Sequence, residues 1–156
     1  MNRLLRVADR VDGGPVSMPR VLAALVPEAY GLTWTVLDLG EVVADERWDL
    51  NLPFIEQRVD ASPRGFELSF ADLSAFAERV RQVVEGLFVG CADPVRLPRR
   101  TDDDATILER AGMLVAATDG GWLVSAEDEL LFRYEARFEQ VSELSTSSVE
   151  LPGWSR

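Results

Sequence analysis

The sequence predicts a single α+β domain over residues 1–156, with a small, mainly antiparallel sheet and two to four helices packed on one side. A chain of 156 residues has the length of one domain with its own core. One segment, residues 70–85, repeats its apolar residues at helical spacing. The pair Asp119-Gly120 lies between two apolar runs, which is typical of a β-hairpin. Further short apolar runs complete the predicted strands, near 32–39, 66–68, 87–91, 113–117 and 121–125.

The first part of the chain contains one clear strand and several weaker patterns. Residues 1–17 are either a short strand or a mobile arm. Residues 18–25 are expected to form a short helix with a proline in its first turn, where proline is tolerated. Alternating apolar residues and threonines predict the strand at 32–39. The acidic segment 40–51 is expected to be a loop, and 53–59 either a short strand or a turn of helix.

The strongest local pattern is an amphipathic helix predicted over 70–85. Its apolar residues recur every three or four positions, and charged residues fall between them. Ser69, followed three residues later by Asp72, is typical of a helix N-cap. Gly86 is expected to end the helix. Phe76 lies in the middle of the apolar stripe, so we expect it to be buried in the core.

The last part of the chain is predicted to contain two helices around the hairpin. Residues 92–104 are rich in proline and charge, which favours a loop. A short helix is expected over 105–111. A second helix is expected over 127–138, with Ser125 as its cap. Residues 145–156 are expected to be a tail, which is either packed or mobile.

The composition removes most of the chemistry used by enzymes. There is no histidine, and all 16 basic residues are arginine. The chain therefore lacks an imidazole base or zinc ligand, and it lacks a lysine for a Schiff base or a P-loop. Cys91 has no histidine partner and is expected to be a small buried apolar residue. We therefore predict a protein that is not an enzyme, with no catalytic residues, no metal and no cofactor.

The formal net charge of -11 limits the partners that the chain can bind. Binding to nucleic acid or to an anionic membrane needs clustered basic residues, so neither is expected. A basic protein partner is favoured, because complementary charge accelerates association. The alternative is that the charge only keeps the protein soluble. Two basic spots interrupt the acidity, within residues 1–20 and at 96–100.

The composition also indicates a compartment. A single cysteine excludes an internal disulfide. The first residues lack the apolar core of a signal peptide, and no apolar run is long enough to span a membrane. We therefore expect a cytoplasmic protein. Arginine without lysine, with abundant alanine, valine and leucine, indicates a GC-rich bacterial genome.

Three acidic clusters are the candidate partner-binding sites. Each has a second interpretation, since acids at the start of a helix stabilise its dipole, and Trp48 can fold back onto the core. A metal site is the weakest interpretation of the aspartate run, because the spacing of a calcium loop is absent. The clusters are Asp45, Glu46, Trp48 and Asp49; Asp102, Asp103 and Asp104; and Glu127, Asp128 and Glu129.

These observations together predict a non-enzymatic, acidic protein-binding module. Its most specific form is an immunity or antitoxin protein that neutralises a basic toxin. One alternative is a small acidic secretion or folding chaperone, which would expose an apolar groove. Another is an enzyme that uses only carboxylates, with or without a metal. The sequence does not indicate which acidic cluster contacts the partner, nor the oligomeric state.

Overall fold

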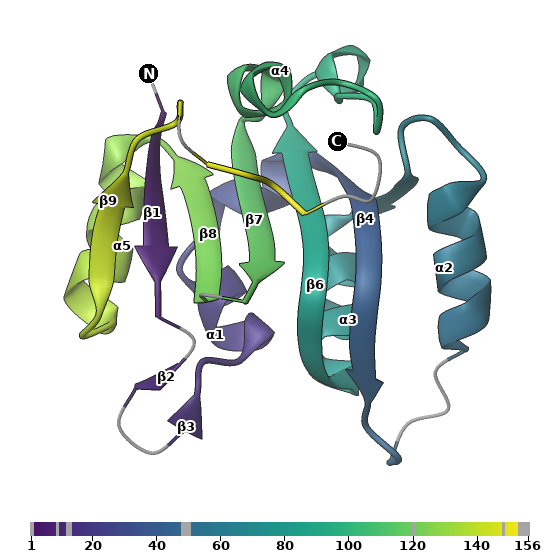
Figure 1. Cartoon of the computed structure of the whole chain (residues 1–156), viewed down its shortest axis with the longest axis horizontal. Coiled ribbons are helices and arrows are strands. Elements are labelled where there is room, and N and C mark those ends of the chain that lie inside the picture. The colour runs from purple at the N-terminus through teal and green to yellow at the C-terminus, as the bar shows by residue number, and fades with distance from the viewer. Residues whose placement is uncertain are drawn as a thin grey trace.

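The computed structural model of the chain describes residues 2–8, 10–11, 14–47, 51–119, 121–147 and 149–152. It contains a seven-stranded antiparallel sheet with the strand order β5-β4-β6-β7-β8-β1-β9, shown in Figure 1. The strands are β1 (Arg3–Val7), β2 (Arg10–Val11), β3 (Gly14–Pro15), β4 (Thr33–Ala44), β5 (Phe66–Ser69), β6 (Val80–Cys91), β7 (Met113–Thr118), β8 (Gly121–Ala126) and β9 (Val141–Leu144). The short strands β2 and β3 pair only with each other.

The helices alternate with these strands along the chain. They are α1 (Met18–Ala23), α2 (Leu52–Asp60), α3 (Phe70–Arg79), α4 (Asp104–Arg110) and α5 (Asp128–Arg137), with 3-10 turns η1 (Glu28–Gly31) and η2 (Pro94–Arg96). The predicted α+β class with a mainly antiparallel sheet is therefore confirmed. The sheet is larger than the small sheet predicted, because β4 and β6 are longer and β1 and β9 join it.

The predicted helix over 70–85 is correct only in its first half. Ser69 caps α3 by accepting a hydrogen bond from the backbone N–H of Asp72 at 3.1 Å, and Phe76 is buried. The helix ends at Arg79, and residues 80–85 belong to β6. Valines at 80, 83 and 84 fit both periods, but β-branched side chains favour a strand once pairing is available.

The pairing partner of this extension is β4, which the sequence placed partly in a loop. The β4–β6 register runs from Thr33 opposite Cys91 to Ala44 opposite Val80, with several irregularities along the way. The prediction of a loop from residue 40 was therefore wrong as far as Ala44. Residues 53–59 lie in α2, where the side chain of Asn51 caps the N-terminus.

The two ends of the chain join the opposite side of the sheet. β1 lies between β8 and β9 and pairs with both of them in antiparallel register. The predicted tail, 145–156, follows β9, and its Leu151 is buried. Ser125 is not the cap of the last helix: it lies in β8, and α5 begins after Glu127. The hairpin prediction is confirmed, since Thr118 pairs with Gly121 at the β7–β8 turn.

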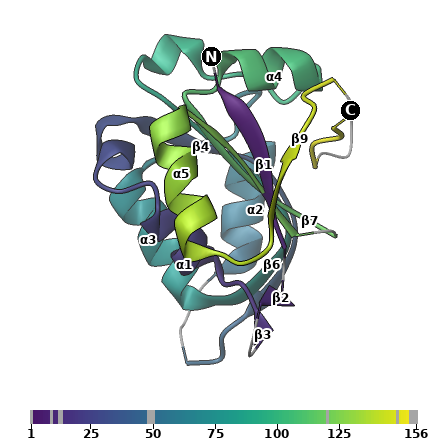
Figure 2. The same ribbon diagram turned by 90° about the vertical axis from the view of Figure 1, so that its left-hand side faces the viewer.

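The sheet has an apolar core on each face. Figure 2 shows α1, α3 and α5 on one side of the sheet, where residues such as Phe70, Leu73 and Phe88 form the larger core. The other face carries a smaller core, in which Ile107 of α4 and Leu151 pack with strand leucines. The helices are therefore not confined to one side, because α4 and the tail cover the second face.

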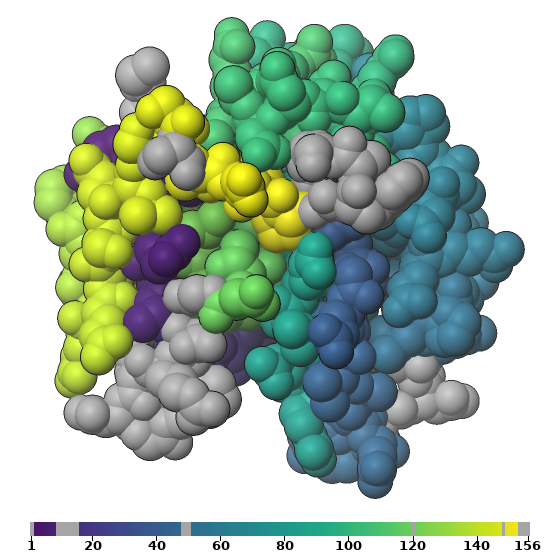
Figure 3. All heavy atoms as spheres, in the orientation of Figure 1, coloured from purple at the N-terminus to yellow at the C-terminus, as the bar shows by residue number. Residues whose placement is uncertain are grey.

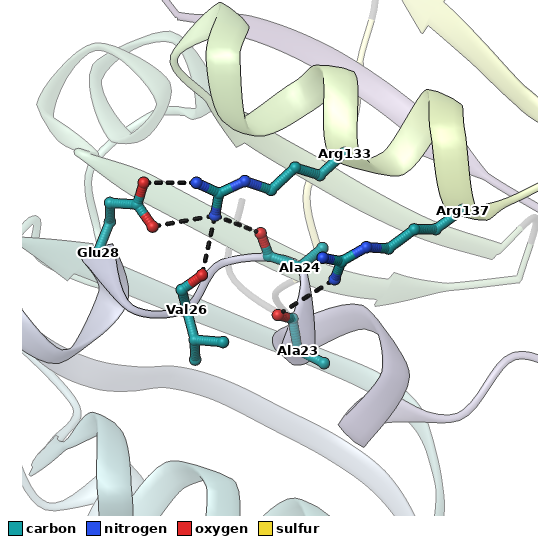
Figure 4. A network of polar contacts seen from close by, with 6 residues as sticks. All are labelled: Ala23, Ala24, Val26, Glu28, Arg133 and Arg137. Carbon is teal, nitrogen blue, oxygen red and sulfur yellow. Dashed lines mark hydrogen bonds and ion pairs between the residues drawn. The ribbon is translucent and has the colours of Figure 1, made fainter.

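Arginines of α5 fix the end of α1, as Figure 4 shows. The guanidinium of Arg133 donates to the carbonyl oxygens of Ala24 and Val26, at 3.1 and 2.9 Å. It also forms a two-point ion pair with Glu28, at 2.9 and 2.6 Å. The buried hydroxyl of Tyr134 donates to the carbonyl of Val21 at 2.6 Å. These contacts satisfy carbonyls that the end of a helix leaves without partners.

Candidate functional site

A cleft of about 770 Å³ opens at the end of the sheet where β6 begins. It lies between the start of α1, the segment after β4, the first half of β6 and the β7–β8 hairpin. In Figure 3 the surface is hollowed at this end, beside the first half of β6. A volume of this size is within the range of ligand-binding clefts.

The cleft follows from the unequal lengths of neighbouring strands. β6 pairs with β4 as far as Val80, but it pairs with β7 only over residues 86–90. Among the described residues, the first half of β6 therefore has a β-strand on one side only. Strand edges of this kind offer backbone groups that another chain can use.

The cleft has an apolar lining beneath its charged residues. Met18, Val83 and Trp122 line it, and each is at most 5% exposed. The indole N–H of Trp122 donates to the carbonyl oxygen of Val16 at 3.0 Å, which fixes the ring. The side chains that form this lining are therefore part of the main core.

Carboxylates outnumber arginines in the lining of the cleft. The charged side chains there are Asp45, Glu46, Glu78 and Asp119 against Arg47 and Arg81. Asp45 forms an ion pair with Arg47 at 2.7 Å. The hydrogen bonds from Arg47 lower the pKa of Asp45 to about 2, so this carboxylate stays ionised at any physiological pH.

Only the first predicted acidic cluster reaches this cleft. Asp45 and Glu46 line it, while Trp48 and Asp49 lie outside the described residues. Sequence reasoning did not single out Glu78, at the end of α3, or Asp119, in the hairpin turn. No local pattern connects these residues, because the fold brings them together from distant segments.

The second predicted cluster holds the local backbone in place. Asp103 caps α4 by accepting a hydrogen bond from the N–H of Thr106 at 2.8 Å, and this bond lowers the pKa of Asp103. Asp102 accepts from the backbone N–H of Arg99 at 2.8 Å. Asp104 accepts from the N–H of Leu151 at 3.2 Å, which ties the tail to α4. The interpretation of these acids as helix-capping residues is confirmed for Asp103.

The third predicted cluster lies at the start of α5, beside an arginine of β1. Arg3 forms ion pairs with Asp128 at 2.7 Å and with Glu143 at 2.5 Å, and it approaches Glu135 at 3.6 Å. Glu127 and Glu129 are exposed at the same helix end. Part of the negative charge of this cluster is therefore already balanced within the molecule.

Cys91 is buried, as the sequence predicted. Its thiol donates to the carbonyl oxygen of Arg110 at 3.3 Å, and burial raises its pKa. A raised pKa keeps the thiol protonated and weakly nucleophilic at neutral pH. Cys91 therefore has the properties of a packed core residue.

Two general searches of the described residues gave no site. No group of three or more carboxylate or cysteine residues in these ranges is arranged to hold a metal ion. None of the described helices combines the length and the apolar character needed to cross a bilayer. Comparisons with protein-family models, curated proteins and solved structures gave no match.

Proposed function

We propose that the protein is a non-enzymatic binding module that holds a basic protein partner in the acidic cleft. The single observation that carries this proposal is a cleft with an apolar floor, whose described lining residues include four carboxylates and two arginines. Protein interfaces combine an apolar centre with a polar rim, and complementary charge accelerates encounter. The net charge of -11 extends the same preference over the whole molecule.

The most specific form of the proposal is an immunity or antitoxin protein that neutralises a basic toxin in the cytoplasm. Such a protein needs a stable core and a fixed acidic surface. The lowered pKa of Asp45 suits a fixed charge, because the carboxylate keeps its charge over the physiological range. Asp45 is therefore not a candidate for a general acid at neutral pH, because that role needs a raised pKa.

A secretion or folding chaperone remains the second candidate, because the apolar lining of the cleft would also suit an unfolded client. The two functions differ in the state of the partner. A neutralised toxin is folded when bound, whereas a client of a chaperone is not. The amide exchange of the bound partner distinguishes them.

The first experiment identifies the partner and then tests the cleft. A partner captured from the native organism at low salt is purified, and its association rate is measured over a range of salt concentrations. The cleft variant is Glu46→Gln/Glu78→Gln/Asp119→Asn, in which Asn-Gly preserves the preference for a tight hairpin turn. The control is Glu67→Gln/Glu109→Gln/Glu139→Gln, which removes three exposed carboxylates that do not line the cleft.

We expect the cleft variant to associate about tenfold more slowly at low salt and to lose most of its salt dependence. The control should stay close to the wild type, because its three charges are dispersed. If both variants slow association equally, the effect belongs to net charge and not to the cleft. If neither does, and the wild type is indifferent to salt, the acidic cleft is not the binding site.

A further inference from the structure

A second hollow lies at the opposite end of the sheet, where β6 ends and β7 begins. Its volume is about 510 Å³. It is lined by Arg64, Val95, Arg96, Arg99, Asp102 and Arg110. The four arginines come from three separate segments: the turn after α2, the segment after β6, and the last residue of α4. The basic spot seen in the sequence at 96–100 is therefore one wall of a larger basic site.

Three of these arginines differ from those that form short ion pairs elsewhere in the described part of the chain. Arg3, Arg47 and Arg133 each form an ion pair with a carboxylate at 2.7 Å or less. Within the described ranges, Arg96, Arg99 and Arg110 form no ion pair and no side-chain hydrogen bond, although the chain carries 27 carboxylates.

The remaining two charged residues of the hollow do not neutralise it. The guanidinium of Arg64 donates to the carbonyl oxygen of Val95 at 3.5 Å. Asp102 is the single acid among the described lining residues, and one of its oxygens accepts from the backbone N–H of Arg99 at 2.8 Å. The hollow therefore has an excess of positive charge in a strongly acidic protein.

A buried arginine holds the wall of this hollow in place. Arg100 lies between Arg99 and the turn at Asp102, and its guanidinium donates to the carbonyl oxygens of Val59, Asp60 and Leu37. Its backbone N–H donates to the carbonyl of Pro63 at 2.6 Å, next to Arg64. The segment with Arg96 and Arg99 is thus fixed against the turn with Arg64, so the site is formed before any ligand arrives.

We infer that this four-arginine hollow binds a small anion that carries several phosphate groups. The planar guanidinium offers two parallel N–H donors to phosphate oxygens, and its charge does not depend on pH in the physiological range. The volume suits a compact ligand. Among the described residues, no aromatic side chain lines the hollow, so these residues offer no ring on which a nucleobase could stack. A long nucleic acid would also be repelled by the net charge of -11.

The experiment measures the binding of inorganic triphosphate by calorimetry. The test variant is Arg96→Gln/Arg99→Gln, in which both residues are exposed, so the fold is preserved. The matched control is Arg6→Gln/Arg20→Gln, which removes the same positive charge from two exposed arginines outside both the hollow and the acidic cleft. We expect the test variant to bind triphosphate about tenfold more weakly or worse, and the control to bind it nearly as well as the wild type.

Three results would overturn the inference. The wild type shows no binding of triphosphate at near-physiological salt, or the control loses as much affinity as the test variant. The third is that a single-stranded oligonucleotide binds more tightly than triphosphate and depends on the same arginines, which would make the ligand a nucleic acid. Melting curves of both variants confirm that they are folded. The result is independent of the proposed partner, because the acidic cleft lies at the other end of β6.

Discussion

The two ends of the sheet carry opposite charge and are built in different ways. At the start of β6, Asp45, Glu46, Glu78 and Asp119 line a cleft over an apolar floor. At the end of β6, four arginines surround a hollow that contains one acid. In Figure 1 these ends are marked by the β7–β8 turn and by α4, respectively. A single strand therefore connects two surfaces whose described linings carry opposite charge.

The two ends of the sheet differ in which charged side chains already form contacts within the fold. At the acidic end, the cleft exists because β4 and β6 extend beyond β7, and its described rim carries four acids, of which Asp45 is paired with Arg47. At the basic end, Arg100, Asp102 and Asp103 form the contacts that hold the local backbone in place. The neighbouring arginines have no ion-pair partners among the described residues. Charged residues that stabilise the fold are therefore neighbours in the sequence of charged residues that are exposed and have no ion-pair partner among the described residues.

Replacing Arg100 with methionine should have the largest effect on stability. It should also affect binding at the basic hollow without affecting binding at the acidic cleft. The change removes a buried cation from the carbonyls of α2 and leaves them without a donor, which should lower the free energy of unfolding by about 2–3 kcal/mol. Triphosphate binding should weaken as well, because the wall of the basic hollow loses its anchor. Partner binding at the acidic cleft should not change. Urea unfolding and the two binding assays check this prediction. An equal loss of binding affinity at the basic hollow and at the acidic cleft would contradict it.

Tyr134→Phe should lower the free energy of unfolding by a smaller amount and should leave both ends of the sheet unchanged. Loss of the hydrogen bond to Val21 should cost about 1 kcal/mol at neutral pH. Burial raises the pKa of Tyr134 above its usual value, so the folded state disfavours the phenolate. The stability that the protonated Tyr134 hydroxyl contributes is complete below about pH 10. It is lost as the pH rises above the pKa that this tyrosine has in the unfolded chain.

Melting curves between neutral and alkaline pH test this second prediction. The wild type should lose stability above about pH 10, and part of that loss should be absent in Tyr134→Phe. Neither binding site should respond to the substitution at neutral pH, because Tyr134 contacts α1 and lies outside both linings. A change in triphosphate affinity would show that the basic hollow is coupled to the contact between α1 and α5.

The sequence predicted the features that depend on neighbouring residues. The strand near 32–39, the hairpin between 113–117 and 121–125 and the Ser69 cap depend on local sequence, and each one is present in the described structure. The extension of β4 and β6 was missed because it depends on pairing between strands that are far apart in the chain. Both sites were missed for the same reason: Glu78 and Asp119, or Arg64 and Arg110, become neighbours only in the folded protein.

The most direct test of the account is hydrogen exchange of the protein with and without its purified partner. The acidic-cleft proposal predicts slower exchange on binding in residues 80–85 and in the described residues of the β7–β8 turn. Residues 94–102, near the basic hollow, should exchange at the same rate in both states. Protection confined to Asp102–Asp104 or to the start of α5, with residues 80–85 unchanged, would contradict the proposal and move the binding surface to another acidic cluster.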